Sequence, residues 1–133
     1  MITCYLRYEV HPDKLADFEA YGAMWLDLMP RFGGVHHGYF LPSEGESDIA
    51  LAMFSFPTLA AYEQYRNDAG RDPDVQKAVA FAKETRCFIR YERSFFRPLL
   101  PKTAQDWTRF CIHGNPSMHQ ETRQPNKPRR LAT

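Results

Sequence analysis

Hydrophobic and polar residues alternate along residues 2–10, at the start of the chain. A period of two is typical of a strand with one buried face, because successive side chains of a strand point to opposite sides. We therefore predict a strand over residues 2–10. Its apolar face carries Ile2, Cys4, Leu6, Tyr8 and Val10, and its other face Thr3, Tyr5, Arg7 and Glu9.

Apolar residues then recur at helical spacing between residues 12 and 32, which predicts an amphipathic helix. Pro12 suits the first turn of this helix, and the pair Gly33-Gly34 suits its end, since many helices terminate in a left-handed residue. The apolar stripe comprises Leu15, Phe18, Gly22, Trp25, either Leu28 or Met29, and Phe32.

Two further strands are predicted at residues 35–41 and 49–56, joined by a polar loop that contains Pro, Ser and Gly. Residues 49–56 are apolar on both faces, as in a central strand that is covered on both sides. A second helical stretch follows over residues 58–85. It is interrupted near residue 70, and Asp72-Pro73 restarts it with an N-cap and a proline at the first helical position.

Residues 87–97 alternate as a fourth strand and complete the order strand–helix–strand, strand–helix–strand. This order is that of the ferredoxin-like βαββαβ arrangement. The predicted fold class is therefore α+β, with a four-stranded antiparallel sheet in which the first and fourth strands are neighbours. Both helices of such a fold pack on one face of the sheet.

The other face of the sheet is predicted to mix charged and aromatic residues, neither a clean core nor a clean solvent face. The simplest way to cover it is a homodimer, sheet against sheet, that closes a dimeric α/β barrel. The charged residues would then form cross-strand or cross-subunit ion pairs, or else they would face water. They are Arg7, Glu9, Arg90 and Glu92.

Charge and cysteine content limit the classes of partner and the cellular compartment that we expect. The 133-residue chain has a formal net charge of +1, so we expect no nucleic-acid or membrane partner. Residues 1–96 carry 10 Lys+Arg and 14 Asp+Glu, whereas residues 97–133 carry 7 and 2, which separates an acidic body from a basic tail. The three cysteines form no CxxC pair and favour reduced thiols, which predicts a cytoplasmic protein.

His36 and His37 are candidate catalytic residues, together with Tyr39. Adjacent strand residues point to opposite faces, so the two histidines would not chelate one metal ion, and we expect neither a metal nor another cofactor. One histidine could act as a general base or a hydrogen-bond donor near neutral pH. The alternative is that both only satisfy backbone or loop groups, such as Ser43 or Glu44.

A pocket wall is predicted where His37 and Tyr39 share a strand face, with Leu51 and Met53 as their cross-strand neighbours. Trp25 could close this pocket from the first helix, or it could be an ordinary core residue. Two arginines could bind a ligand carboxylate, or serve only in the ion pairs above. The candidate ligand-binding residues are therefore Arg7, Trp25, His37, Tyr39 and Arg90.

Several sequence blocks are similar to those of one known family. They are Tyr5-Leu6-Arg7-Tyr8, Gly33-Gly34, His36-His37-Gly38-Tyr39-Phe40-Leu41-Pro42, Phe54-Ser55-Phe56, Tyr62-Glu63-Gln64-Tyr65-Arg66 and Arg90-Tyr91-Glu92-Arg93-Ser94-Phe95-Phe96. On these blocks, residues 1–98 resemble the NIPSNAP family. The resemblance implies a ferredoxin-like domain in a dimeric α/β barrel. It implies no particular reaction, because the wider fold group includes both cofactor-independent monooxygenases and ligand-binding modules.

Residues 99–133 lie outside the resemblance and are predicted to be a basic tail, in which residues 103–112 could form one short helix. For the domain over residues 1–98 we expect a homodimer that binds a small molecule in a pocket. The alternative is a small cofactor-independent enzyme, similar to a monooxygenase or an isomerase, that uses histidine, tyrosine and arginine. The chain contains no GxGxxG, GxxxxGK[ST] or HExxH motif that would support nucleotide or metalloprotease chemistry.

Overall fold

The computed structural model of the protein describes residues 1–101, and the predicted helix over residues 103–112 lies outside them. The strands are β1 (Ile2–Val10), β2 (Val35–Phe40), β3 (Ile49–Phe56) and β4 (Phe88–Phe96). The helices are α1 (Leu15–Leu28), α2 (Leu59–Ala69) and α3 (Pro73–Thr85), and short 3-10 turns at Pro12–Lys14 and Met29–Phe32 flank α1.

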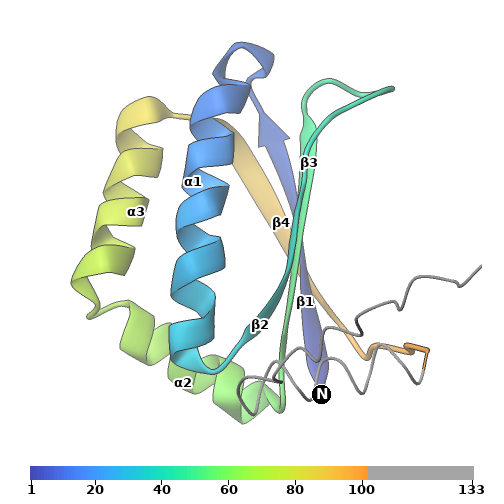
Figure 1. Cartoon of the computed structure of the whole chain (residues 1–133), viewed down its shortest axis with the longest axis vertical. Coiled ribbons are helices and arrows are strands. Elements are labelled where there is room, and N and C mark those ends of the chain that lie inside the picture. The colour runs from blue at the N-terminus through green and yellow to red at the C-terminus, as the bar shows by residue number, and fades with distance from the viewer. Residues whose placement is uncertain (102–133) are drawn as a thin grey trace, which may run out of the picture.

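The four strands form one antiparallel sheet in the order β2-β3-β1-β4, which confirms the predicted ferredoxin-like arrangement. Strands β1 and β4 are neighbours, as predicted, and the central pair is β1 and β3. The three helices lie on one side of the sheet, and no described helix covers the other side, which is called the open face below (Figure 1).

The core lies between the sheet and the helices. The predicted apolar face of β1 is buried: Cys4, Leu6, Tyr8 and Val10 are each at most 6% exposed. Phe18, on α1, is fully buried against this layer, and its ring contacts Tyr8 with a centroid distance of 5.0 Å. The apolar face of β1 and the apolar stripe of α1 therefore form the two halves of one core, as the spacing of their hydrophobic residues predicts.

Cap contacts mark the starts of α2 and α3, whereas the helix predicted over residues 12–32 is α-helical only over Leu15–Leu28 and continues as 3-10 turns at both ends. Thr58 Oγ1 accepts a hydrogen bond from the Ala61 N–H (3.0 Å) at the start of α2. Asp72 accepts from the backbone N–H groups of Asp74 and Val75 (2.9 and 3.1 Å) at the start of α3. Gly33 is left-handed, with φ +82°, after the second 3-10 turn.

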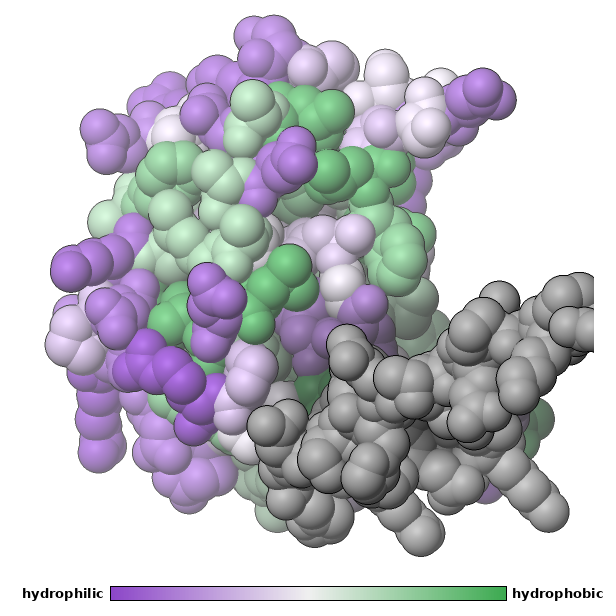
Figure 2. Space-filling model, viewed as in Figure 1, coloured by the Kyte–Doolittle hydropathy of each residue, from purple (hydrophilic) through white to green (hydrophobic). Residues whose placement is uncertain are grey.

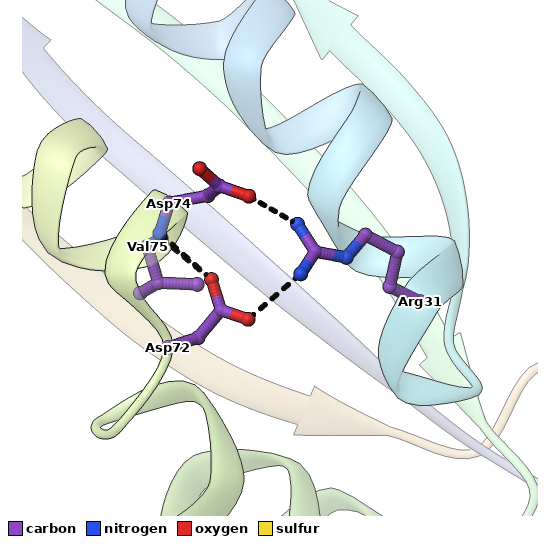
Figure 3. Close-up of polar contacts among 4 residues, drawn as sticks. All are labelled: Arg31, Asp72, Asp74 and Val75. Atoms are coloured by element: carbon purple, nitrogen blue, oxygen red, sulfur yellow. Dashed lines mark hydrogen bonds and ion pairs between the residues drawn. The ribbon is translucent and has the colours of Figure 1, made fainter.

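The same end of α3 is held by Arg31, which follows α1. Its guanidinium donates to Asp72 Oδ2 (2.8 Å) and Asp74 Oδ2 (2.9 Å), so that one arginine bridges two carboxylates (Figure 3). Because Arg31 binds both carboxylates, it fixes the turn between α2 and α3 against the end of α1. The two acidic groups also complement the positive end of the helix dipole of α3.

The open face carries the charged residues that the sequence placed there. Arg90 pairs across the strands with Glu9 (3.0 Å) and along β4 with Glu92 (3.5 Å), which confirms the cross-strand form of the predicted ion pairs. Arg7 instead lies 4.0 Å from Glu46 of the β2–β3 loop. Among residues 1–101, no helix is both long and apolar enough to cross a membrane.

Candidate functional site

A β-bulge in β2 determines which side chains meet at the candidate site. In the register of β2 with β3, His36 lies opposite Phe54 and Gly38 opposite Met53, so that His37 is the additional residue. Gly38 has φ +122°, a conformation that side chains with a Cβ rarely adopt. The positive φ accounts for the glycine at this position. A close approach of another group does not, because a Cβ here would meet nothing within 4 Å.

The bulge overturns the prediction that His37 and Tyr39 share a face. One additional residue shifts every later side chain by one position, so that Tyr39 lies opposite Ala52 and points to the helices together with His36. The rings of His36 and Tyr39 stack at a centroid distance of 5.0 Å and an interplanar angle of 19°. His37 lies on the open face, where its Nε2 is 2.7 Å from Ser55 Oγ.

The side of the sheet that carries His36 and Tyr39 forms the floor of a cavity of about 290 Å³. Strands β1 to β4 supply its floor, and α1, α2 and α3 supply its roof. Nearly half of the residues that line it are Phe, Trp or Tyr. Figure 2, seen from the same side as Figure 1, shows apolar residues that reach the surface among polar ones. The lining includes Tyr8, Tyr21, Trp25, Tyr39, Phe54 and Tyr62.

The structure divides the five predicted ligand-binding residues between the two faces of the sheet. Trp25 and Tyr39 line the cavity, and so does the catalytic candidate His36. Arg7, His37 and Arg90 belong to the open face, across the sheet from this cavity. The two arginines that the sequence nominated for a carboxylate therefore do not meet Trp25 and Tyr39.

Two other arginines, Arg66 and Arg93, line the cavity, and sequence reasoning missed both. Arg93 lies opposite Leu6 in the β1–β4 register, on the helix side of the sheet. The signal that could have found it was the pairing of these two neighbouring strands, since a residue directly opposite buried Leu6 shares its face. An arginine within an alternating charged stretch gives no such indication by itself.

His36 is suited to donate a hydrogen bond rather than to act as a base. The Gly38 N–H donates to His36 Nδ1 (3.0 Å), so the neutral ring carries its proton on Nε2. Burial, followed by the nearby His37, lowers the pKa of His36 to about 4. At neutral pH the ring is thus uncharged, and the nitrogen that could take up a proton is already engaged.

The tyrosines of the cavity are neutral at physiological pH for a similar reason. Burial raises the pKa of Tyr21 to about 12 and raises the pKa of Tyr8, Tyr39 and Tyr65 well above the usual value. Their hydroxyls can donate or accept hydrogen bonds without charge. The cavity therefore presents an aromatic wall with hydroxyl and N–H groups, and its formal charges are those of the two arginines.

Ser55 on the open face contacts two other polar side chains, but it is not placed as a nucleophile. Its Oγ lies 2.7 Å from both His37 Nε2 and Thr3 Oγ1, yet Ser55 is only 2% exposed. A nucleophile must reach its substrate, and the hydroxyl of Ser55 is too buried to do so. We therefore interpret these hydrogen bonds as a structural link across β1, β2 and β3. Among residues 1–101, no group of three His, Cys, Asp or Glu side chains is arranged to hold a metal ion.

We expect the stability of the domain to fall as pH is lowered from 6.5 to 4. Because the folded-state pKa of His36 (about 4) is below its unfolded value of 6.5, the unfolded state binds more protons in this window. The expected loss is about 1–2 kcal/mol, allowing for partial exposure of the ring. Urea unfolding of the wild type and of His36→Gln at pH 7, 5.5 and 4 would measure it.

The variant should lose less free energy of unfolding than the wild type over this range. His37→Gln measures the contribution of the neighbouring histidine separately, since burial lowers the pKa of His37 as well and its contribution has the same sign. Equal pH dependence of the wild type and His36→Gln would contradict the assignment of this effect to His36.

Comparisons with known proteins agree with the fold. A family model described as NIPSNAP matches residues 5–101 of the chain. No curated protein sequence matches it.

Three solved structures illustrate the likeness. A NIPSNAP family protein with unknown function from Agrobacterium tumefaciens is 14% identical, with a TM-score of 0.64 over 74% of this chain and 87% of that one. A NIPSNAP-like domain protein from Burkholderia xenovorans is 16% identical, with a TM-score of 0.63 over 74% and 84%. SnoaB, a cofactor-independent oxygenase from Streptomyces nogalater, is 18% identical, with a TM-score of 0.50 over 76% and 95%. At these identities the likeness concerns the fold alone.

Proposed function

The chain belongs to the NIPSNAP family, and from this premise we propose that it binds a small, largely apolar molecule in the cavity between its sheet and its helices. The observation that carries the proposal is the cavity itself, about 290 Å³ with many aromatic side chains and a few polar groups in its walls. Concave, aromatic-lined spaces of roughly this size, at the lower end of the usual range, are typical small-molecule sites.

The same proposal includes a homodimer formed through the open face, in a cytoplasmic protein. The open face exposes Phe40 (48%), which lies opposite the partly buried Leu51, and Phe96 (56%), which lies opposite Thr3 on β1. No described helix covers these apolar side chains, and a second copy of the sheet would remove them from water. Since this face and the cavity lie on opposite sides of the sheet, dimer formation would leave the cavity accessible.

An enzymatic role, similar to that of a cofactor-independent oxygenase, is the second candidate. Its support is the presence of His36, Tyr39 and Arg93 around one cavity, together with the fold that the chain shares with one such oxygenase. This candidate function lacks a clear general base, because His36 already accepts a hydrogen bond at Nδ1. The cavity would then stabilise a negatively charged oxygen through N–H donors, without taking a proton at His36.

Native mass spectrometry of freshly purified protein tests the binding role and the dimer in one measurement. We expect the mass of two chains plus a small additional mass, which disappears after denaturation. In Val79→Trp the added bulk stands at the rim of the cavity, so the additional mass should be lost while the dimer remains.

Lys77→Trp is the matched control, because Lys77 is exposed on the same helix and does not line the cavity. This variant should retain both the dimer and the additional mass. A single-chain mass would contradict the dimer. A ligand retained in Val79→Trp would contradict the placement of the binding site.

A further inference from the structure

Two buried N–H groups of the cavity wall have no hydrogen-bond partner in the part of the chain that the structure describes. They are Trp25 Nε1, from α1, and Arg93 Nε, from β4. Both residues line the same cavity. A buried donor without a partner destabilises the folded state, more so when it is charged, so these two atoms require an explanation.

Both donors belong to the part of the cavity wall that includes Tyr21. A contact with the indole of Trp25 and, more weakly, the charge of Arg93 each counteract part of the rise in the pKa of Tyr21 that burial causes. The contact of the indole N–H with the Tyr21 hydroxyl falls short of hydrogen-bond geometry, so the Trp25 N–H is left without a well-formed acceptor. An acceptor group between the helix and the strand would satisfy both N–H groups together.

The surroundings of Arg93 favour a negative charge on that acceptor. Arg66 is the second cation of the cavity, and both arginines lower the pKa of Tyr65 relative to the effect of burial. The described residues that line the cavity include no Asp or Glu. None of the ion pairs found within residues 1–101 involves Arg66 or Arg93.

Arg93 is instead oriented by an aromatic ring. Its guanidinium carbon lies 5.5 Å from the centroid of Tyr91, a cation–π contact. The guanidinium also interacts with the buried thiol of Cys4, while its Nε–H stays without a partner. Arg90, three residues earlier on β4, shows the contrast: it is engaged by Glu9 and Glu92 on the open face. One strand thus carries a neutralised arginine on one face and an unpaired one on the other.

We propose that the ligand of this cavity is an aromatic carboxylate, whose carboxylate oxygens accept hydrogen bonds from Arg93 and Trp25. A carboxylate supplies the acceptors that both N–H groups lack and the charge that the arginines lack. Its aromatic body would pack among Tyr8, Tyr39 and Phe54, where neutral hydroxyls do not oppose a negative ligand. This inference rests on the proposed binding function and deepens it.

Isothermal titration of the full chain with 2-naphthoate and its neutral isostere 2-naphthamide tests the charge preference. We expect 2-naphthoate to bind at least about 10-fold more tightly than the amide. Arg93→Met should weaken 2-naphthoate by about 10- to 100-fold and change the amide by less than about 3-fold. Trp25→Phe removes one N–H while keeping an aromatic ring, so it should reduce the same preference without unfolding the domain.

Arg90→Met is the matched control, since it removes an arginine of the same strand from the open face and should change neither affinity. Equal binding of the two probes by the wild type would overturn the carboxylate inference and leave the binding function intact. An unchanged preference in folded Arg93→Met and Trp25→Phe would also overturn it. Failure of both probes to bind the wild type would contradict the binding function and, with it, this inference.

Discussion

Replacing Phe18 with alanine should lower the free energy of unfolding by about 3–5 kcal/mol. Phe18 is fully buried, and its ring lies within 5.0 to 6.3 Å of three rings from three different strands. They are Tyr8 of β1, Tyr39 of β2 and Phe88 of β4. The substitution would therefore leave a cavity at the point where α1 joins the sheet, and the surrounding rings cannot collapse to fill it without moving the strands.

A loss of this size is a large share of the stability of a small domain, which is typically about 5–15 kcal/mol. Urea unfolding followed by circular dichroism would measure it, and Phe18→Leu, a milder change, would keep the series measurable if the alanine variant is unfolded. Leu59→Ala is the control, because Leu59 is 58% exposed on α2 and should change stability by less than about 0.5 kcal/mol. A Phe18→Ala loss below about 1 kcal/mol would contradict the role of this ring as the centre of the core.

The fold was predictable because its main signals are local and mutually consistent. The alternation of residues 2–10, the Asp72-Pro73 restart and the glycine at position 33 each specify one element or one boundary, and the structure confirms all three. Strand order then follows from connectivity, since few arrangements satisfy two strand–helix–strand units in one sheet. None of these inferences requires the position of a single side chain to be exact.

The candidate site was less predictable because it depends on single-residue register. The bulge at His37 exchanges the faces expected for the residues of β2 that follow it, and the shift between Glu9 and Val10 in the β1–β4 pairing does the same for Phe88. Strict alternation places Phe88 beside Arg90, yet its ring packs on Phe18 in the core. Because β3 is apolar on both faces, the hydrophobic pattern cannot reveal which register its neighbour takes.

The unpartnered N–H groups are invisible in the sequence for a different reason. Trp25 was recognised as a pocket candidate from its place on α1, but the state of its N–H depends on what lies opposite in space. Arg93 comes from the other end of the domain, 68 positions along the chain. Only the pairing of β4 with β1 brings them to one cavity, so the proposed carboxylate site depends on the tertiary structure.

Gly38→Ala should lower the free energy of unfolding by about 1–3 kcal/mol, although the new methyl group touches nothing. A Cβ at this position has no atom within 4 Å, so the whole effect would come from holding an alanine at φ +122°. Gly70→Ala is the matched control: Gly70 has φ −61° and only ordinary contacts of 3.7 Å, so the change should be neutral or slightly stabilising. Urea unfolding of both variants would measure the difference.

Deleting Gly38 should be less harmful than substituting it. Without Gly38, His37 would lie opposite Met53 in a regular strand, while His36 stays opposite Phe54 and Tyr39 stays opposite Ala52. The deletion thus removes the residue with the strained φ and, at the same time, the bulge. Both His36 and Tyr39 keep pointing into the cavity. Titration of 2-naphthamide would show whether the cavity survives, and urea unfolding would rank the variants. A deletion variant less stable than Gly38→Ala would mean that the bulge supports the sheet through interactions other than the placement of these two rings.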